Sequence, residues 1–157
     1  MTEIRRILDD GRESERVVEL WDRMCRETPD GGPLTRTGRR NLDRMLAMTA
    51  WHERSFCLVA VDAGAIVGFV CGRLETGDGL LPGAVGELNE LYVEPDHPDA
   101  RSLPGRLLEA AIAQLRVGGE MWTIRSTFDV DDRDRRGLLE QLGFEADMIT
   151  MSLYAAE

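Results

Sequence analysis

The chain has 157 residues and a mass of 17.6 kDa, the size of one ordinary domain and too little for two. Its 43% hydrophobic and 31% charged residues lie outside the composition range of disordered chains. The 19 basic and 29 acidic side chains give a net charge of -10, which opposes binding to nucleic acid or an anionic membrane surface and is compatible with cationic partners. We therefore expect a single domain over residues 1–157.

Two further properties bear on location and on metal binding. The longest uncharged stretch, Ala63–Gly72, is about half of the roughly 20 residues that a membrane-spanning helix needs, and no apolar run follows Arg5 and Arg6 as in a secretory signal. We expect a cytoplasmic protein without a helix that crosses a membrane. The three cysteines form no CxxC pair: Cys25, Cys57 and Cys71. Their odd number and spacing indicate neither a disulfide framework nor a metal site.

The N-terminal half of the chain predicts one strand, two helices and a hairpin. Glu3–Leu8 is typical of an edge strand, and apolar residues at i, i+3, i+4 and i+7 predict an amphipathic helix that starts near Ser14. A second helical pattern covers Thr35–Thr49. The wholly apolar run Phe56–Val61 predicts an inner strand, and Ile66–Leu74 predicts the returning strand of a hairpin.

The C-terminal half predicts three more strands and two more helices. In chain order these are a strand at Val85–Val93, a helix with its apolar stripe in Leu107–Leu115, a strand at Met121–Phe128, a helix at Asp131–Leu142 and a strand at Met148–Tyr154. Gly143 stands just past the last helix, where a left-handed cap residue belongs. The order mixes hairpins with one β-α-β unit, so we expect a mixed sheet with helices on both faces.

The most informative segment is the strand at Glu87–Pro95 and the helix that follows it. A strand whose loop opens a helix presents unpaired backbone N–H groups and the positive end of the helix dipole, which together suit an anion such as pyrophosphate. Every β-α unit has such an end, so this pattern alone is weak. Three segments carry more information: Glu87-Leu88-Asn89-Glu90-Leu91-Tyr92-Val93-Glu94-Pro95, Leu107-Leu108-Glu109-Ala110-Ala111 and Gly137–Glu145, which ends a helix in Gly-Phe.

On these segments the chain resembles the GNAT superfamily of N-acetyltransferases over nearly its whole length. The resemblance implies an α/β (α+β) fold: a central mixed, mostly antiparallel, twisted sheet of six or seven strands flanked by about four helices. It also implies that the Val85–Val93 strand is bulged and parts from Met121–Phe128, leaving a slot for acetyl-CoA. The residues that we expect to bind that co-substrate, from the resemblance and from the charges beside it, are Leu91, Tyr92, Val93, Arg101, Ser102, Leu103, Gly105, Arg106 and Asp132.

The chain departs from the family pattern in its phosphate loop. When Leu107-Leu108 anchors the comparison, Ser102 and Pro104 stand where the family has glycines. Pro104 has no N–H to donate, and a hydrogen bond to a charged group contributes about 1.5 to 3 kcal/mol, so its loss weakens cofactor binding by about one to two decades. We expect Arg101 and Arg106 to replace part of that interaction by pairing with phosphate.

Acetylation of an amine needs a proton acceptor, because an alkylamine has a pKa of about 10 and is mostly protonated at pH 7. Glu87 stands where the histone acetyltransferase branch of the family carries its general base, and Asn89 shares its face by strand alternation. Glu90 points to the opposite face unless a bulge intervenes, so it is the second choice. A solvated glutamate without a catalytic role is the alternative for either residue.

The usual general acid of the family is also missing, because Leu139 stands where many members have Tyr. A thiolate with a pKa of about 8.5 can leave without strong proton donation, so transfer should be slower rather than abolished. Tyr92 could substitute, although a strand Tyr usually has a packing role. His97, in the loop before the phosphate segment, is either a cofactor contact or an ordinary surface residue.

We therefore predict an N-acetyltransferase that passes an acetyl group directly from acetyl-CoA to an amine. The acceptor is a small molecule or a lysine-bearing protein, no covalent enzyme intermediate is expected, and the oligomeric state, including a homodimer, stays open. The alternative is a catalytically inactive GNAT-like domain that serves as a CoA-binding sensor or interaction module. The missing glycine pair and Leu139 support this alternative.

Overall fold

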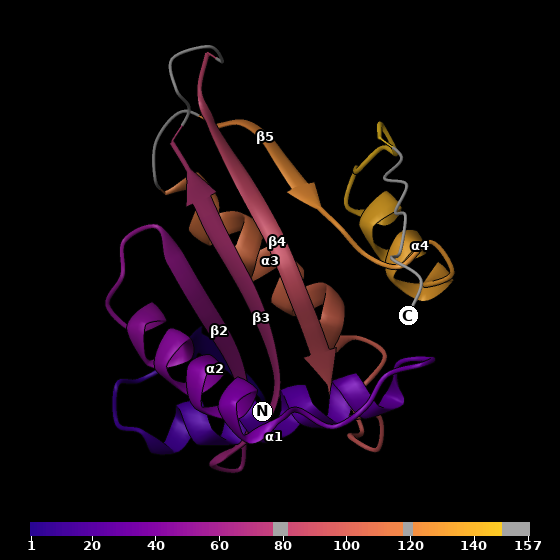
Figure 1. The fold of residues 1–157 in the computed structure, drawn as a ribbon. Helices are drawn as coiled ribbons and strands as arrows, with labels where there is room; N and C mark the ends of the chain where they lie inside the picture. Colours follow the sequence, from indigo (N-terminus) through magenta and orange to yellow (C-terminus); the bar gives the residue numbers. More distant parts are fainter. Residues whose placement is uncertain (77–81, 118–120, 149–157) are drawn as a thin grey trace, which may run out of the picture. The chain divides into compact units, whose positions relative to one another are not determined.

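The structure is a computed structural model that describes residues 1–76, 82–117 and 121–148. The chain forms two compact units, Met1–Thr127 and Phe128–Glu157. The first unit holds the sheet and three helices, and the second holds the fourth helix (Figure 1). The expected single domain over 1–157 stays a prediction.

The sheet of the first unit has five strands whose order in space follows the chain. They are β1 (Glu3–Arg6), β2 (Ser55–Asp62), β3 (Ala65–Glu75), β4 (Ala84–Val93) and β5 (Met121–Ser126). The first three pairings are antiparallel and the β4–β5 pairing is parallel, so the predicted mixed, mostly antiparallel sheet is confirmed. The described residues form fewer strands than the six or seven predicted. The missing strand was expected at Met148–Tyr154, of which residues 149–154 lie outside the described part.

The β2–β3 hairpin is closed by a two-residue loop. Ala63 and Gly64 both have positive φ angles, 48° and 83°, as the type I′ turn requires. The turn pairs Asp62 with Ala65, and a bulge between Ala60 and Val61 then shifts the register by one residue, so that Cys57 lies directly opposite Cys71. The predicted inner strand is confirmed, because residues 56–60 are all buried.

The described residues form four helices, as predicted: α1 (Arg12–Glu27), α2 (Arg36–Thr49), α3 (Leu103–Arg116) and, in the second unit, α4 (Arg133–Gln141). The predicted α2 start at Thr35 is its N-cap, where the Thr35 hydroxyl oxygen accepts the Gly38 N–H at 3.0 Å. α1 packs on β3 and β4, α2 packs on β2, and α3 packs on the other face of the sheet (Figure 1). Within the described part of the chain, every helix is too short or too polar to cross a membrane.

The core between α1, α2 and the sheet is built on aromatic packing. Phe69 of β3 is fully buried, stacks on Trp21 of α1 with ring centroids 5.4 Å apart and meets Tyr92 of β4 at 6.4 Å. Burial of one such aromatic side chain contributes about 1.5 to 3 kcal/mol, so these contacts fix α1 across the C-terminal end of β4. On the opposite face, Gly86 of β4 leaves room for Leu115 of α3.

The second unit ends its helix as the sequence predicts. Gly143 has a φ angle of 87°, and the N–H groups of Gly143 and Phe144 donate to the carbonyls of Glu140 and Leu139, each at 3.0 Å. These two bonds form a Schellman motif, which satisfies carbonyls that the last helical turn leaves open. At the other end, the Asp132 carboxylate caps α4 by accepting the Arg135 N–H at 3.0 Å.

Candidate active site

One extra residue in β4 creates a bulge near the middle of the sheet. Val70 of β3 lies opposite Leu91, and Gly72 lies opposite Leu88, so two steps along β3 correspond to three along β4. The additional residue falls at Asn89 or Glu90. A bulge of this kind bends the strand and changes the face to which the following side chains point.

The pairing between β4 and β5 covers only the first half of β4. It runs from Ala84 opposite Met121 to Leu88 opposite Ser126, where β5 ends. β4 continues to Val93, so the backbone of residues 91–93 lies beyond the last β5 pair. Figure 1 shows β5 turning away from this half of β4. The bulge and the parting of the two strands, both expected from the family resemblance, are therefore present.

The bulge brings Glu87 and Glu90 to the same face of the sheet. Glu87 precedes the bulge and pairs with Arg73. Glu90 follows it, and its negative charge adds to the burial that raises the pKa of the Cys25 thiol on α1. It also contributes to the raised pKa of Cys71 on β3, which is due first to a hydrogen bond with Cys57. The sequence placed Glu90 on the opposite face from Glu87 unless a bulge intervenes. The bulge does intervene, because strand alternation is interrupted between the two glutamates.

Glu87 is held by a guanidinium group of the neighbouring strand. Arg73 Nε and one terminal nitrogen of Arg73 each lie 2.6 Å from Glu87 Oε2, and this contact raises the pKa of Arg73. Arg73 also pairs with Glu75 at 2.9 Å. The sequence did not identify Arg73, because the pairing depends on the β3–β4 register. Asn89 lies within the bulge and is partly buried.

Tyr92 points toward α1 and its hydroxyl is already bonded. It donates to the Glu27 carboxylate, with distances of 3.0 Å to Oε1 and 3.1 Å to Oε2. Burial, together with the bond to Glu27, raises the pKa of Tyr92 to about 12. The phenol is therefore protonated at neutral pH, and Glu27 directs its proton. Leu91 and Val93 flank it in the strand and are partly buried.

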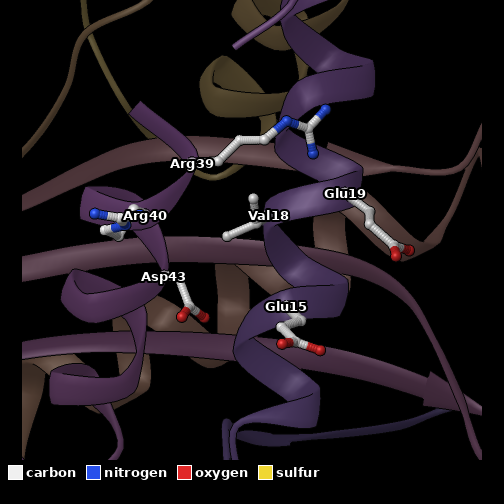
Figure 2. A pocket seen from close by; sticks show the side chains of 6 residues that line it. All are labelled: Glu15, Val18, Glu19, Arg39, Arg40 and Asp43. Atoms are coloured by element: carbon white, nitrogen blue, oxygen red, sulfur yellow. The ribbon is translucent and has the colours of Figure 1, made fainter. Parts of the chain in front are cut away.

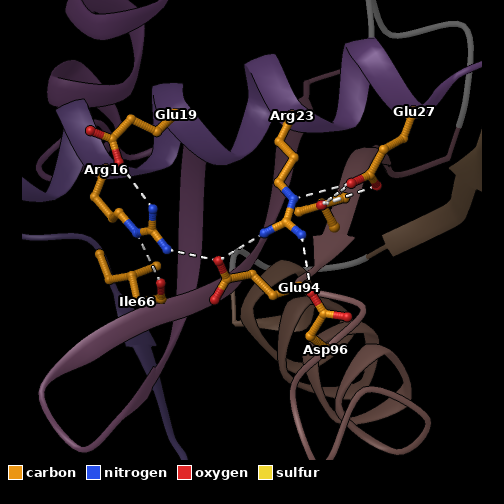
Figure 3. Close-up of polar contacts among 8 residues, drawn as sticks. Arg16, Glu19, Arg23, Glu27, Ile66, Glu94 and Asp96 are labelled. Carbon is orange, nitrogen blue, oxygen red and sulfur yellow. Dashed lines mark hydrogen bonds and ion pairs between the residues drawn. The ribbon is translucent and has the colours of Figure 1, made fainter.

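Arg23 of α1 connects Glu27, the hydrogen-bond partner of Tyr92, to the loop after β4. Arg23 lies 3.1 Å from Glu27, 3.3 Å from Glu94 and 3.4 Å from Asp96, using a different nitrogen for each (Figure 3). Arg16, two turns earlier, donates to the Ile66 carbonyl at 3.2 Å and pairs with Glu94 at 2.9 Å. The start of the predicted phosphate loop is therefore tied to α1 by a network of charges.

The predicted phosphate segment forms the turn that opens α3. The N–H groups of Ser102 and Leu103 both donate to the Asp99 carbonyl, at 3.0 and 2.9 Å. Pro104 stands at the second helical position, where it has no N–H, and Gly105 follows it. Two of the donors expected to bind pyrophosphate thus have an internal partner in this conformation.

Arg101 and Arg106, which we expect to assist in phosphate binding, have different surroundings. Arg106 donates to the Thr2 carbonyl at 2.9 Å, which anchors its guanidinium beside the start of β1. Arg101 is exposed one residue before the N-cap of α3. Asp132, the remaining predicted cofactor contact, belongs to the second unit, where its carboxylate caps α4. Its predicted role toward the cofactor is untested.

A separate hollow lies between α1 and α2. It has a volume of about 320 Å³ and is lined by charged side chains around one valine (Figure 2). The lining residues are Glu15, Val18, Glu19, Arg39, Arg40 and Asp43. Since all the residues predicted for acyl transfer lie elsewhere, this hollow is not the predicted site.

Comparison with known proteins gives a family match and many structural matches. The family model described as "Acetyltransferase (GNAT) family" matches residues 16–144. No curated protein matches the chain in sequence. A transcriptional regulator from Bacillus halodurans C-125 has a similar fold, with a TM-score of 0.75, 17% identity, and coverage of 99% of this chain and 100% of that one.

Two acetyltransferases of known structure have the same fold. Glucosamine-6-phosphate N-acetyltransferase from Arabidopsis thaliana matches with a TM-score of 0.73 and 16% identity, covering 98% of each chain. An aminoglycoside N-acetyltransferase in complex with CoA matches with a TM-score of 0.75 and 15% identity, covering 99% of this chain and 95% of the other. At such identities the structural matches establish the fold and leave the acceptor undefined.

Proposed function

Because this chain belongs to the acetyltransferase (GNAT) family, we propose that it transfers an acetyl group from acetyl-CoA directly to an amine of a small molecule or of a lysine-bearing protein. The observation that carries the proposal is the incomplete pairing of β4 with β5. Beyond Leu88 the β4 backbone extends past the end of β5 and can align an extended ligand by main-chain hydrogen bonds.

The pantetheine arm of acetyl-CoA would lie along the backbone of residues 91–93. Main-chain groups of a strand are rigid and need no reorientation, so they hold the thioester in one geometry and can polarise its carbonyl. The acceptor would approach from the α1 side, where Glu87 and Glu90 both lie. The amine nitrogen then bonds to the carbonyl carbon, the carbon–sulfur bond breaks, and coenzyme A leaves as its thiolate.

The proton of the amine would pass to a carboxylate, directly or through water. Glu87 is the first candidate and Glu90 the second, and the bulge supports both because it gives them a common face. Asn89, between them, would orient the acceptor. Both Arg73 contacts to Glu87 involve Oε2, so the guanidinium fixes the direction of this carboxylate.

The pyrophosphate of the co-substrate would lie at the turn that opens α3. Gly105 provides an N–H near the positive end of the helix dipole, and Arg101 is exposed beside it. Ser102 and Leu103 would contribute after their N–H groups exchange Asp99 for phosphate, and Arg106 after it releases Thr2. We therefore expect weaker binding of acetyl-CoA than a glycine-rich loop would give.

A binding measurement followed by an activity assay tests the proposal. A ligand present at 100 times its dissociation constant stabilises a protein by about 2.7 kcal/mol, which thermal unfolding detects. Acetyl-CoA at millimolar concentration should produce such a shift, and thiol release should follow when amines are added. No thermal shift with acetyl-CoA would overturn the proposed function.

Matched variants assign the base. Glu87→Gln and Glu90→Gln should each be compared with Glu75→Gln, which also removes a carboxylate partner of Arg73 but lies on β3. Removal of a general base lowers kcat by about 100-fold or more, while the control should keep most of the activity. Equal activity of all three variants would exclude both glutamates as the base.

The engagement of the Ser102 and Leu103 N–H groups favours one alternative function. A domain whose phosphate turn is internally bonded and which has Leu139 in place of a Tyr could bind CoA as a sensor without catalysis. A thermal shift with acetyl-CoA, but no thiol release with any amine of a broad panel, would support this alternative over the transferase.

A further inference from the structure

We propose that His97 is a positioning residue for the co-substrate: it holds the loop between β4 and α3 in the shape that accepts the pyrophosphate of acetyl-CoA. The inference rests on the proposed function, because it assigns a role within the same site. The ring of His97 joins the β2–β3 turn to the backbone of this loop. Only 8% of the His97 side chain is accessible, whereas 90% of the Asp96 side chain in the same loop is accessible.

Both ring nitrogens of His97 face a partner. Nδ1 lies 3.2 Å from the Asp99 N–H, which can only donate, so Nδ1 carries no proton. The ring proton is then on Nε2, which lies 3.4 Å from Asp62 Oδ2. The neutral ring thereby bridges a carboxylate at the β2–β3 turn and an amide of the loop, and each contact fixes the tautomer that the other needs.

The same amide belongs to the residue that organises the start of α3. The Asp99 carbonyl accepts the N–H groups of Ser102 and Leu103, two of the donors assigned to pyrophosphate. The backbone of His97 adds two turn bonds, from its N–H to the Glu94 carbonyl at 3.1 Å and from the Ala100 N–H to its own carbonyl at 2.9 Å. Because these two N–H groups are already bonded, the ring acts through the turn as a whole: by holding Asp99 it fixes where Arg101 and the Gly105 N–H stand for the pyrophosphate.

The other side of the loop has a different kind of anchor. Glu94 and Asp96 are tied to Arg23 of α1, whose side chain is 41% exposed (Figure 3). Exposed ion pairs hold a segment weakly, whereas a buried ring with two directed bonds leaves little freedom. Without the ring, the Asp99 turn would lose one of its anchors and be less ordered before the ligand binds, and the cost of completing that order would weaken binding.

The chain contains a matched control in its second histidine. His52 Nδ1 also accepts backbone N–H groups, those of Arg54 and Ser55 at 3.1 Å each, but it does so beside the start of β2. His52→Leu and His97→Leu remove the same type of contact from two different turns. His97→Asn restores an acceptor near the Nδ1 position, and Asp62→Ala removes the distant partner while leaving the ring in place.

The test compares two thioesters on the full chain by calorimetric titration: acetyl-CoA and S-acetylpantetheine, which lacks the pyrophosphate. His97→Leu should raise the dissociation constant of acetyl-CoA about 3- to 10-fold, as expected for the loss of one or two net hydrogen bonds. The constant for S-acetylpantetheine should change less than twofold. His97→Asn should recover part of the affinity, and His52→Leu should change neither constant.

Each other outcome overturns one specific claim. Equal weakening of both thioesters, or an unchanged acetyl-CoA constant in His97→Leu, would contradict the positioning role while leaving the proposed function intact. If His97→Leu does not fold, Asp62→Ala is the deciding variant. It should raise the dissociation constant of acetyl-CoA about 2- to 5-fold without a similar change for S-acetylpantetheine. An unchanged dissociation constant for acetyl-CoA would contradict the positioning role. A wild-type protein that binds neither thioester would overturn the proposed function itself.

Discussion

The hydroxyl of Tyr92 is buried against the Glu27 carboxylate, and this contact can be measured in alkaline solution. Burial raises the pKa of Tyr92 to about 12, and the bond to Glu27 adds to the effect. An ultraviolet absorbance titration of the folded protein should therefore contain a phenolate component near pH 12 that Tyr92→Phe removes. Persistence of that component in the variant would contradict the assignment.

The same shift predicts how stability changes with pH. A tyrosine whose folded pKa is raised above its unfolded value of about 10 contributes stability that is fully present below pH 10. That contribution is lost as the pH rises from about 10 through the folded value of about 12. Denaturant titrations at pH 8 and 11 should show a smaller alkaline loss of unfolding free energy in Tyr92→Phe than in wild type.

Gly72 of β3 permits the close approach of β4 at the bulge. A Cβ atom added there would lie 2.4 Å from Phe56 Cζ and 2.9 Å from the Glu87 carbonyl oxygen. We expect Gly72→Ala to lose about 1 to 3 kcal/mol of unfolding free energy, because the core on this face would be overpacked. Urea unfolding at neutral pH measures the change.

Gly137 of α4 provides the opposite case for comparison. An added Cβ atom there meets nothing within 4 Å, and glycine inside a helix costs about 0.5 to 1 kcal/mol relative to alanine. Gly137→Ala should therefore be neutral or stabilising. If both alanine variants had the same stability, the close contact assigned to Gly72 would be wrong.

At the scale of the elements, Arg23 couples α1 to both Tyr92 and the loop after β4. Its positive charge favours the phenolate of Tyr92 and so lowers the pKa that burial and Glu27 raise. Arg23→Met should move the ionisation of Tyr92 to still higher pH in the absorbance titration. A shift to lower pH would show that Arg23 acts on Tyr92 by some route other than its charge.

The sequence alone could predict most elements, because their periodicity is local. The apolar run at Phe56–Val61, the helical stripe through Leu107 and the cap at Gly143 each depend on neighbours in the chain, and all three agree with the structure. The resemblance to the family added the bulge in β4, which no local pattern indicates. The last expected strand, from residue 149 on, lies outside the described residues.

The contacts of the candidate site were less predictable, because they depend on register. The pairing of Arg73 with Glu87 follows from which residues of β3 and β4 stand opposite each other. A single extra residue reverses the face to which a strand side chain points, so Glu90 could not be placed from alternation alone. The contact of His97 with Asp62 joins residues 35 positions apart in the chain, which no local pattern indicates.

At the scale of the whole molecule, the net charge of -10 acts on the two proposed substrates in opposite directions. A negatively charged protein attracts cationic amines and repels the phosphates of acetyl-CoA at distances within the Debye length, which is about 30 Å at 0.01 M salt and about 8 Å at 0.15 M. Added salt should therefore slow the encounter with a cationic acceptor and ease the approach of acetyl-CoA.

Steering by the net charge can be distinguished from general salt inhibition by comparing two acceptors. The two should have the same reacting amine but a different total positive charge. Between 0.01 and 0.15 M salt, kcat/KM for the more highly charged amine should fall several-fold, and more steeply than for the singly charged one, because screening weakens steering in proportion to charge. The association rate of acetyl-CoA, measured by stopped flow over the same range, should stay constant or rise. Parallel decreases for all three ligands would contradict steering by the net charge and would indicate general salt inhibition instead.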